Sequence, residues 1–117
     1  MLLLWYPKCT TCQKAHKFLE ENGADFEERD IKEQNPADTE LRTWHKTSGL
    51  PLKKFFNTSG LLYKELNLKE KLLELTEDEQ FALLASNGML VKRPLLLIGK
   101  DFVLIGFKQA EWEKHLK

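Results

Sequence analysis

Residues 6–23, YPKCTTCQKAHKFLEENG, decide the fold because they mark a junction between a strand and a helix. Residues 2–6 form a continuous apolar run, which is typical of a buried central strand in a parallel sheet. Small or apolar side chains then recur at helical spacing, at Cys12, Ala15 and Leu19. Gly23 follows them as a C-terminal cap. The stretch therefore predicts a strand, a tight turn and a helix.

Further segments extend this unit into a sheet. Residues 25–31 predict a modest strand near an edge, and a strand–helix–strand unit implies a parallel pair with a right-handed crossover. Apolar runs at residues 95–98 and 102–105 flank a glycine turn, which predicts an antiparallel hairpin. Residues 108–117 predict a closing helix. The side chains that we expect this helix to bury in part are Ala110, Trp112 and Leu116.

Residues 35–88 predict a helical insert between the two halves of the sheet. Asn35-Pro36 starts its first helix, since asparagine is a good N-cap and proline suits the first helical position. Asn67 and Thr76 each begin a capping-box pattern, which predicts two further helices. We therefore expect one α/β domain over residues 1–117, with a mixed four-stranded sheet in the order β-α-β, helical insert, β-β-α.

Composition sets the broad class of the protein. Lysine plus arginine and aspartate plus glutamate both number 18 in 117 residues, so net charge gives no reason to expect direct binding of nucleic acid or an anionic membrane. The N-terminal apolar run is too short for a signal peptide or a membrane span. We expect a cytoplasmic protein, where a close cysteine pair is more often catalytic or metal-binding than structural.

The two cysteines of the chain, Cys9 and Cys12, stand at the predicted strand–helix junction. A helix N-terminus carries free N–H groups and partial positive charge, both of which favour thiolate over thiol. Lys8 precedes Cys9 and adds positive charge. Cys12 lies one turn further in, where we expect more burial. This asymmetry predicts that Cys9 attacks a substrate and that Cys12 resolves the mixed disulfide.

Two other interpretations of the cysteines stay open. Cys9, Cys12 and His16 supply three zinc ligands, but a structural zinc site needs four and no fourth is evident. The second interpretation is that both thiols are inert. Arg93-Pro94, just before the third predicted strand, supports a redox site, because proline at a strand start often marks special geometry such as a cis bond. The alternative is a simple loop-ending proline. No pattern for a bound cofactor is present.

Several blocks of sequence together resemble the ArsC/Spx family, and above all its small ArsC-related members in Gram-positive bacteria. These blocks are PKCTTC (7–12), FFNTSGLLYKELNLKEKL (55–72), LLASNGMLVKRPLLL (83–97) and Gly106-Phe107. The resemblance implies a thioredoxin-like fold with a helical insert and an exposed nucleophile at Cys9. It also implies that Pro94 is a cis-proline facing the cysteine loop, with backbone beside it for an extended substrate. Arg93 would hold an anion or the Cys9 thiolate.

The resemblance implies two alternative activities as well. Arsenate reductases of this family, coupled to glutaredoxin or thioredoxin, surround one cysteine with three arginines. Arg93 matches one arginine, whereas Asn57 and Gly106 stand at the other two positions. Spx-type regulators use a CxxC switch and bind RNA polymerase through a glycine-containing segment, which Gly49 matches in place. We therefore expect a thiol–disulfide redox protein whose partner is a thiol or disulfide substrate or a small oxyanion, with arsenate reduction and binding of the RNA polymerase α subunit as alternatives.

Overall fold

The computed structural model describes residues 1–116 of the chain. A four-stranded sheet with strand order β2-β1-β3-β4 forms its centre. The strands are β1 (Leu2–Trp5), β2 (Glu27–Asp30), β3 (Leu95–Ile98) and β4 (Phe102–Ile105). β1 pairs in parallel with β2 and antiparallel with β3, and β3 pairs antiparallel with β4. The predicted mixed sheet is confirmed, with the second strand at an edge and the first strand inside the sheet.

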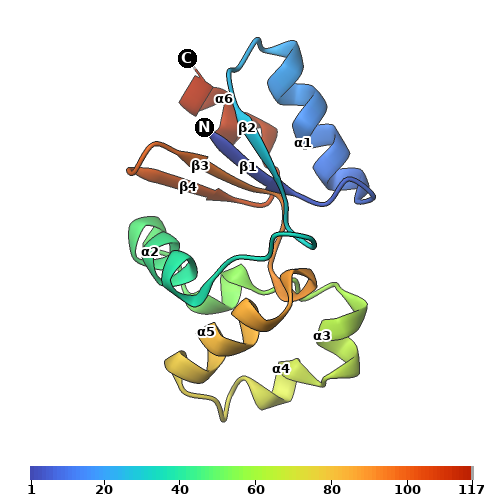
Figure 1. The fold of residues 1–117 in the computed structure, drawn as a ribbon, viewed down its shortest axis with the longest axis vertical. Coiled ribbons are helices and arrows are strands. Elements are labelled where there is room, and N and C mark those ends of the chain that lie inside the picture. Colours follow the sequence, from blue (N-terminus) through green and yellow to red (C-terminus); the bar gives the residue numbers. More distant parts are fainter. Residues whose placement is uncertain (117) are drawn as a thin grey trace.

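Helices cover both faces of this sheet (Figure 1). α1 (Thr10–Glu21) and α6 (Gln109–Leu116) pack on one face, where Leu3, Leu96 and Trp112 belong to one core cluster. The insert covers the other face, where Leu4 and Leu95 join a larger cluster. Successive residues of a strand point to opposite faces, so the leucine runs of β1 and β3 supply both cores. Burial on both faces explains why these strands are continuous apolar runs.

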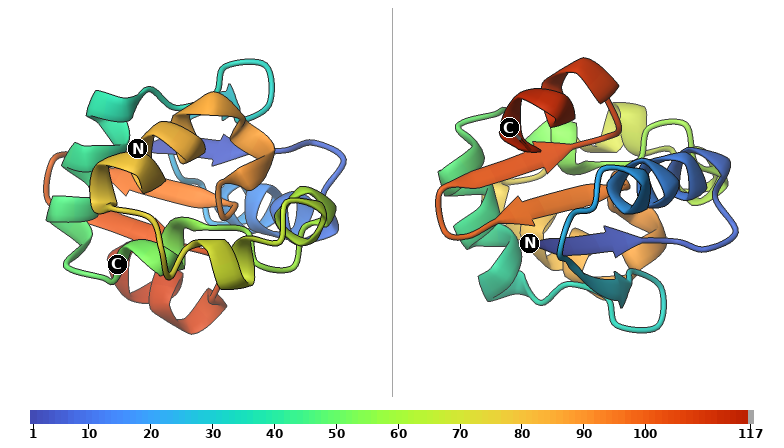
Figure 2. Two further views of the ribbon diagram at one scale, coloured as in Figure 1. Left: turned by 90° about the horizontal axis from the view of Figure 1, so that it is seen from below. Right: turned by 90° about the horizontal axis from the view of Figure 1, so that it is seen from above.

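The insert between β2 and β3 is built from short helical segments. They are α2 (Asp38–Ser48), the 3-10 turn η1 (Leu52–Phe55), α3 (Leu61–Glu65), α4 (Leu68–Lys71), α5 (Glu77–Ser86) and the 3-10 turn η2 (Gly88–Leu90). Viewed from below, the insert lies in front of the sheet, and viewed from above α1 and α6 do (Figure 2). Within residues 1–116, none of the helices has the length and apolar character needed to cross a bilayer.

The first helix of the insert begins later than predicted. Its N-cap is Ala37, whose N–H donates to the Glu40 carboxylate at 3.0 Å. Arg29 on β2 holds that carboxylate with two hydrogen bonds of 2.8 and 2.9 Å. The Asn35 amide, predicted to cap this helix, instead donates to the Ala85 carbonyl at 2.6 Å. Asn35 therefore links the start of the insert to α5, and the prediction of a cap at Asn35-Pro36 is wrong.

The two predicted capping boxes have different outcomes. At Thr76 the box is confirmed, because the Thr76 hydroxyl accepts the Glu79 N–H at 3.2 Å and the Glu79 carboxylate accepts the Thr76 N–H at 3.0 Å. Asn67 adopts a left-handed backbone conformation (φ 52°) and has no capping bond to the backbone of α4. Its amide donates instead to the Glu70 carboxylate at 3.2 Å, so this box is wrong.

The closing helix α6 is held by one aromatic side chain. Trp112 is fully buried, and its indole N–H donates to the Gly106 carbonyl at 3.1 Å. Leu116 is half-buried, as predicted, but Ala110 is exposed. Ala110 precedes Trp112 by two residues, about 200° around the helix axis, so it faces away from the core. The last residue of the predicted helix, Lys117, lies outside the described residues.

Candidate active site

Cys9 occupies the N-cap of α1, just after β1 has ended. Its backbone is extended (φ −90°, ψ 125°), its N–H donates to the Tyr6 carbonyl at 2.9 Å, and its carbonyl accepts the Gln13 N–H at 2.9 Å. The Gln13 amide also donates to the Pro7 carbonyl at 2.7 Å, which ties the loop to the first helical turn. The Cys9 thiol therefore lies where the free N–H groups and partial positive charge of α1 favour an anion.

The two thiols, both free, differ sharply in their surroundings. Cys12 is fully buried, and this burial, together with the neighbouring Cys9 side chain, raises the pKa of Cys12 to about 12. Cys9 is partly exposed. Its partial burial acts to raise its pKa, but the nearby N–H and thiol of Cys12 and the Arg93 guanidinium favour the thiolate and outweigh burial, so the pKa of Cys9 lies below its ordinary value. These opposite directions agree with the unequal pair expected from the sequence.

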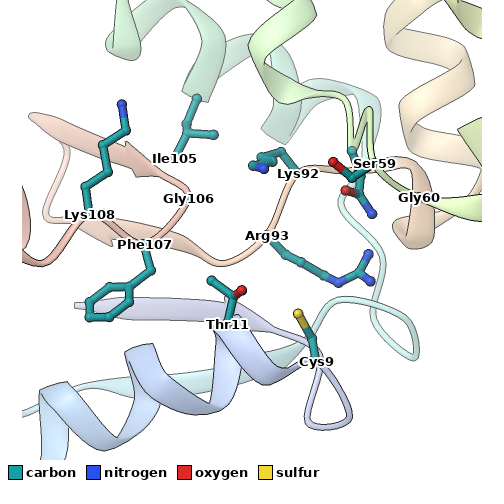
Figure 3. Close-up of a pocket in the computed structure, with 11 residues that line it drawn as sticks. Cys9, Thr11, Ser59, Gly60, Lys92, Arg93, Ile105, Gly106, Phe107 and Lys108 are labelled. Carbon is teal, nitrogen blue, oxygen red and sulfur yellow. The ribbon is translucent and has the colours of Figure 1, made fainter.

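A cavity of about 450 Å³ lies beside the Cys9 thiol (Figure 3). Four segments far apart in sequence form its walls, namely the start of α1, the loop after η1, the residues before β3, and the end of β4 with the loop after it. The lining residues are Cys9, Thr11, Asn57, Ser59, Gly60, Lys92, Arg93, Ile105, Gly106, Phe107 and Lys108. The cavity is therefore assembled by the tertiary fold, with only Cys9 and Thr11 coming from the cysteine loop and helix.

Arg93 contributes a partly buried guanidinium to this cavity. Its guanidinium carbon lies 5.3 Å from the centre of the Tyr6 ring, a cation–π contact. Its Nε and Nη1 atoms are buried and have no hydrogen-bond partner within residues 1–116. Buried polar groups are normally paired, and a guanidinium grips oxyanions through parallel N–H donors. Arg93 therefore presents unused donors beside the Cys9 thiol.

The residues around Arg93 complete a positively charged site. The peptide bond to Pro94 is cis, as the resemblance implied, and the Pro94 carbonyl accepts the Gly106 N–H at 2.8 Å. Lys92 and Lys108 also line the cavity, whereas no aspartate or glutamate is among its lining residues. A cavity whose charged lining side chains, apart from the Cys9 thiolate, are all cationic attracts anions.

The structure brings together most of the residues singled out from the sequence. Cys9 and Arg93 share the cavity, and Asn57 and Gly106, which stand where arsenate reductases carry arginine, line it too. Pro94 is buried and is not among the residues that line the cavity. Lys8 is exposed and does not line the cavity, although it directly precedes Cys9.

Sequence reasoning missed four polar residues of the cavity, Thr11, Ser59, Lys92 and Lys108. Lys92 directly precedes Arg93 in the LLASNGMLVKRPLLL block, so the prediction of a site at Arg93 could have included it. Lys92 also lies against Gly106, because a Cβ built on that glycine would lie 3.5 Å from the Lys92 Cε atom. Nothing in the local sequence marks Ser59 or Lys108, since only the fold brings them to Cys9.

The described part of the chain does not place side chains as the zinc interpretation requires. Residues 1–116 contain no cluster of three histidine, cysteine or acidic side chains placed to hold a metal ion. His16 turns away from the cysteines toward two carboxylates, with Nε2 2.6 Å from Glu28 and Nδ1 3.0 Å from Glu20. Its ring also stacks on Trp5 with centroids 4.3 Å apart.

Known proteins resemble this chain over nearly its whole length. The uncharacterized protein YusI of Bacillus subtilis is 57% identical over 111 residues, which is 95% of this chain and 93% of YusI. A crystal structure of an ArsC family related protein from Bacteroides fragilis has a TM-score of 0.93 and 59% identity, covering 99% of this chain and 96% of that one. A structure described as a possible arsenate reductase from Streptococcus mutans has a TM-score of 0.89 and 46% identity, covering 97% and 96%.

The relatives do not share one described activity. The regulatory protein MgsR of Bacillus subtilis is 30% identical over 112 residues, covering 96% of this chain and 86% of MgsR.

The model of the ArsC family matches residues 4–115. Together with the strand order and the cysteine at the first strand–helix junction, this match shows that the chain belongs to the ArsC family and has its thioredoxin-like fold.

Proposed function

We propose that this protein carries out thiol–disulfide exchange, with Cys9 as the nucleophile and Cys12 as the resolving thiol. The observation that carries the proposal is the contrast between two thiols one helical turn apart: Cys9 lines a cationic cavity, whereas Cys12 is fully buried. The opposite directions of their pKa shifts agree with this contrast. The thiolate is the reactive form of cysteine, so a lowered pKa selects Cys9 as the group that attacks.

In the first step the Cys9 thiolate attacks one sulfur of a substrate disulfide. A new S–S bond forms between Cys9 and that sulfur, the substrate S–S bond breaks, and its electron pair leaves on the second sulfur as a thiolate. Arg93 lies beside this reaction and stabilises the negative charge that begins on Cys9. The N-terminus of α1 acts in the same sense.

In the second step Cys12 loses its proton and attacks the Cys9 sulfur. This forms the Cys9–Cys12 disulfide and releases the remaining substrate thiolate, so two electrons have passed to the substrate. The charge of Cys9 contributes to the raised pKa of Cys12, and the mixed disulfide removes that charge. The pKa of Cys12 therefore falls once Cys9 has reacted, which favours the resolving step in the correct order.

Return to the dithiol form needs an external thiol reductant, and we assign this part to a glutaredoxin- or thioredoxin-type dithiol. Such a donor fits the cytoplasmic location that the cysteine content favours.

The test is trapping of the mixed disulfide with bis(2-hydroxyethyl) disulfide. Cys12→Ser should stop at a stable adduct on Cys9, whereas the wild-type chain should form the internal disulfide and release both thiols. Cys9→Ser is the matched control and should form no adduct near neutral pH. Mass spectrometry distinguishes these products. An adduct on Cys12 in the Cys9→Ser variant, or no internal disulfide in the wild type, contradicts the proposal.

Arsenate reduction is a second candidate, favoured by the unpartnered Arg93 donors and by the 46%-identical possible arsenate reductase from Streptococcus mutans. It needs Cys9 and Arg93 but not Cys12. We therefore assay arsenate-dependent NADPH oxidation coupled to glutaredoxin or thioredoxin, in the wild type and in Cys12→Ser. Turnover that survives Cys12→Ser supports arsenate chemistry, and no turnover with either donor refutes it.

A regulatory role is suggested by the 30% identity to MgsR. In this role the Cys9–Cys12 pair would act as a redox switch for binding the RNA polymerase α subunit. Gly49, the residue matched to the contact segment, ends α2 with φ 67° and is exposed. Pull-down of the α C-terminal domain with oxidised and reduced protein tests this role, and equal or absent binding in both states rules it out.

A further inference from the structure

A second cavity of about 600 Å³ adjoins the Cys9 cavity, and the two share Lys92, Ile105 and Lys108 as a common wall. In Figure 3 these three residues stand on the side of the first cavity opposite Cys9. The second cavity continues from them toward Lys53 and Lys54 of η1. We call the continuous surface from Cys9 to Lys54 the lysine groove.

The lysine groove is cationic along its length. Lys53, Lys54, Lys92 and Lys108 line its second cavity, and no acidic residue is among the lining residues of either cavity. None of the ion pairs found within residues 1–116 uses these four lysines. The chain as a whole is neutral, with 18 basic and 18 acidic residues, so this grouping is a local separation of charge.

The lysine groove also has an apolar part. Leu50, which is 40% exposed, lines its second cavity together with Ile105 and the almost fully buried Phe56. A small oxyanion would need only the Arg93 end near Cys9. A surface that joins apolar lining to a row of cations suits a longer ligand with both apolar and acidic groups.

We propose that the lysine groove binds an acidic polypeptide segment whose cysteine, oxidised in a disulfide, reacts with Cys9. This inference rests on the proposed thiol–disulfide exchange and names its substrate class. The substrate cysteine lies at the Arg93 end of the lysine groove, while aspartate or glutamate side chains beside it contact the four lysines. Exchange follows the two steps given above, and the substrate receives both electrons as two thiols.

Single-turnover reduction of three disulfides tests the proposal. Two are disulfide-linked peptides of equal length, one with aspartate and glutamate around its cysteine and one with lysine there. The third is the neutral bis(2-hydroxyethyl) disulfide, which carries no charged group for Lys53 or Lys54 to attract. The reduced wild-type chain should react fastest with the acidic peptide, and added salt should remove this preference because it screens charge.

The decisive variant is Lys53→Ala/Lys54→Ala, which lies away from Cys9 and leaves the catalytic end intact. Loss of two surface ion pairs corresponds to roughly a 2- to 30-fold slower reaction with the acidic peptide. The rate with the small disulfide should be unchanged. Lys69→Ala/Lys71→Ala on α4 is the matched control, since it removes the same charge from exposed lysines outside both cavities. An equal effect of both double variants, or no preference for the acidic peptide, overturns the proposal.

A binding measurement separates the proposal from the proposed function. The acidic peptide with serine in place of its cysteine should bind the wild-type chain in fluorescence anisotropy and bind Lys53→Ala/Lys54→Ala more weakly. If this binding is seen but no disulfide is reduced, thiol–disulfide exchange is refuted and the docking surface is supported. If the small disulfide is reduced but the serine peptide does not bind, the exchange stands and the docking surface is refuted.

Discussion

Replacing Arg93 by methionine tests whether this side chain keeps Cys9 ionised. The N–H groups and positive charge of the guanidinium lower the pKa of the Cys9 thiol, against the opposing effect of partial burial. Methionine keeps much of the length and apolar stem of arginine but removes both effects. We therefore expect the pKa of Cys9 to rise in the variant, and the pH profile of its reactivity to move to higher pH.

The size of this effect follows from the strength of the interaction. A hydrogen bond to a charged group is worth roughly 1.5–3 kcal/mol when it is well shielded, and contact with water weakens such interactions. Because Cys9 is partly exposed, we take about 1 kcal/mol for Arg93, which corresponds to roughly a fivefold lower ratio of thiolate to thiol below the pKa.

The assay is the rate of alkylation by iodoacetamide in a Cys12→Ser background, which leaves Cys9 as the single thiol. The Arg93→Met variant should react several-fold more slowly at neutral pH and reach the same plateau at high pH. Arg42→Met is the matched control, because Arg42 pairs with Asp38 and Asp78 on the insert and is absent from the Cys9 cavity. Thermal unfolding confirms that each variant is folded.

The reasoning is refuted if the Arg93→Met profile coincides with that of the parent chain, or moves to lower pH. The first result would mean that groups other than Arg93 determine the ionisation of Cys9, and the second that Arg93 raises the pKa of Cys9 instead of lowering it. A similar shift in Arg42→Met would show that net charge, rather than the position of Arg93, sets the reactivity.

Three further predictions concern stability and are measured by urea unfolding of the reduced chain. The pKa of Cys12 is raised from 9.0 to about 12 on folding, so its contribution to the free energy of unfolding is intact below pH 9.0 and is lost as pH rises toward about 12. Between these pH values the free energy of unfolding of the wild type should fall by about 1.4 kcal/mol per pH unit relative to that of Cys12→Ala. Thr76→Ala should cost about 1 kcal/mol, because it removes the hydroxyl that accepts the Glu79 N–H. Gly88→Ala should cost about 2 kcal/mol or more, since its Cβ would lie 1.7 Å from the Ile31 carbonyl oxygen. An unchanged free energy of unfolding in any of these comparisons would contradict the corresponding prediction.

Local patterns in the sequence predicted the fold where local interactions decide it. The leucine runs of β1 and β3 predict buried strands correctly, because both faces of the sheet are covered and the strands are apolar on both sides. Thr76 read as an N-cap because both bonds of its capping box lie within four residues. The position of Cys9 followed from the strand, the turn and the helix spacing around it.

Predictions failed where a distant partner decides the conformation. The N-cap of α2 is Ala37 and not Asn35, because Arg29 on β2 holds the Glu40 carboxylate that accepts the Ala37 N–H. The Asn35 amide donates to the Ala85 carbonyl of α5 instead. The cavity shows the same limit, since Lys108 lies about a hundred residues from Cys9 along the chain yet lines the same space. No local pattern marks such a residue.

The second cysteine favours disulfide exchange over arsenate chemistry for an electrostatic reason. The negative charge on Cys9 helps to raise the pKa of Cys12 to about 12, so Cys12 stays protonated while Cys9 is a thiolate. A mixed disulfide on Cys9 is neutral and removes that charge, so the pKa of Cys12 falls, although burial, the largest cause, still acts to raise it. An arsenic oxyanion attached to Cys9 keeps negative charge at the same place and leaves the barrier to Cys12 ionisation largely intact. The buried position of Cys12 therefore suits resolution of a neutral disulfide, and an arsenate adduct on Cys9 would persist until an external thiol attacked it.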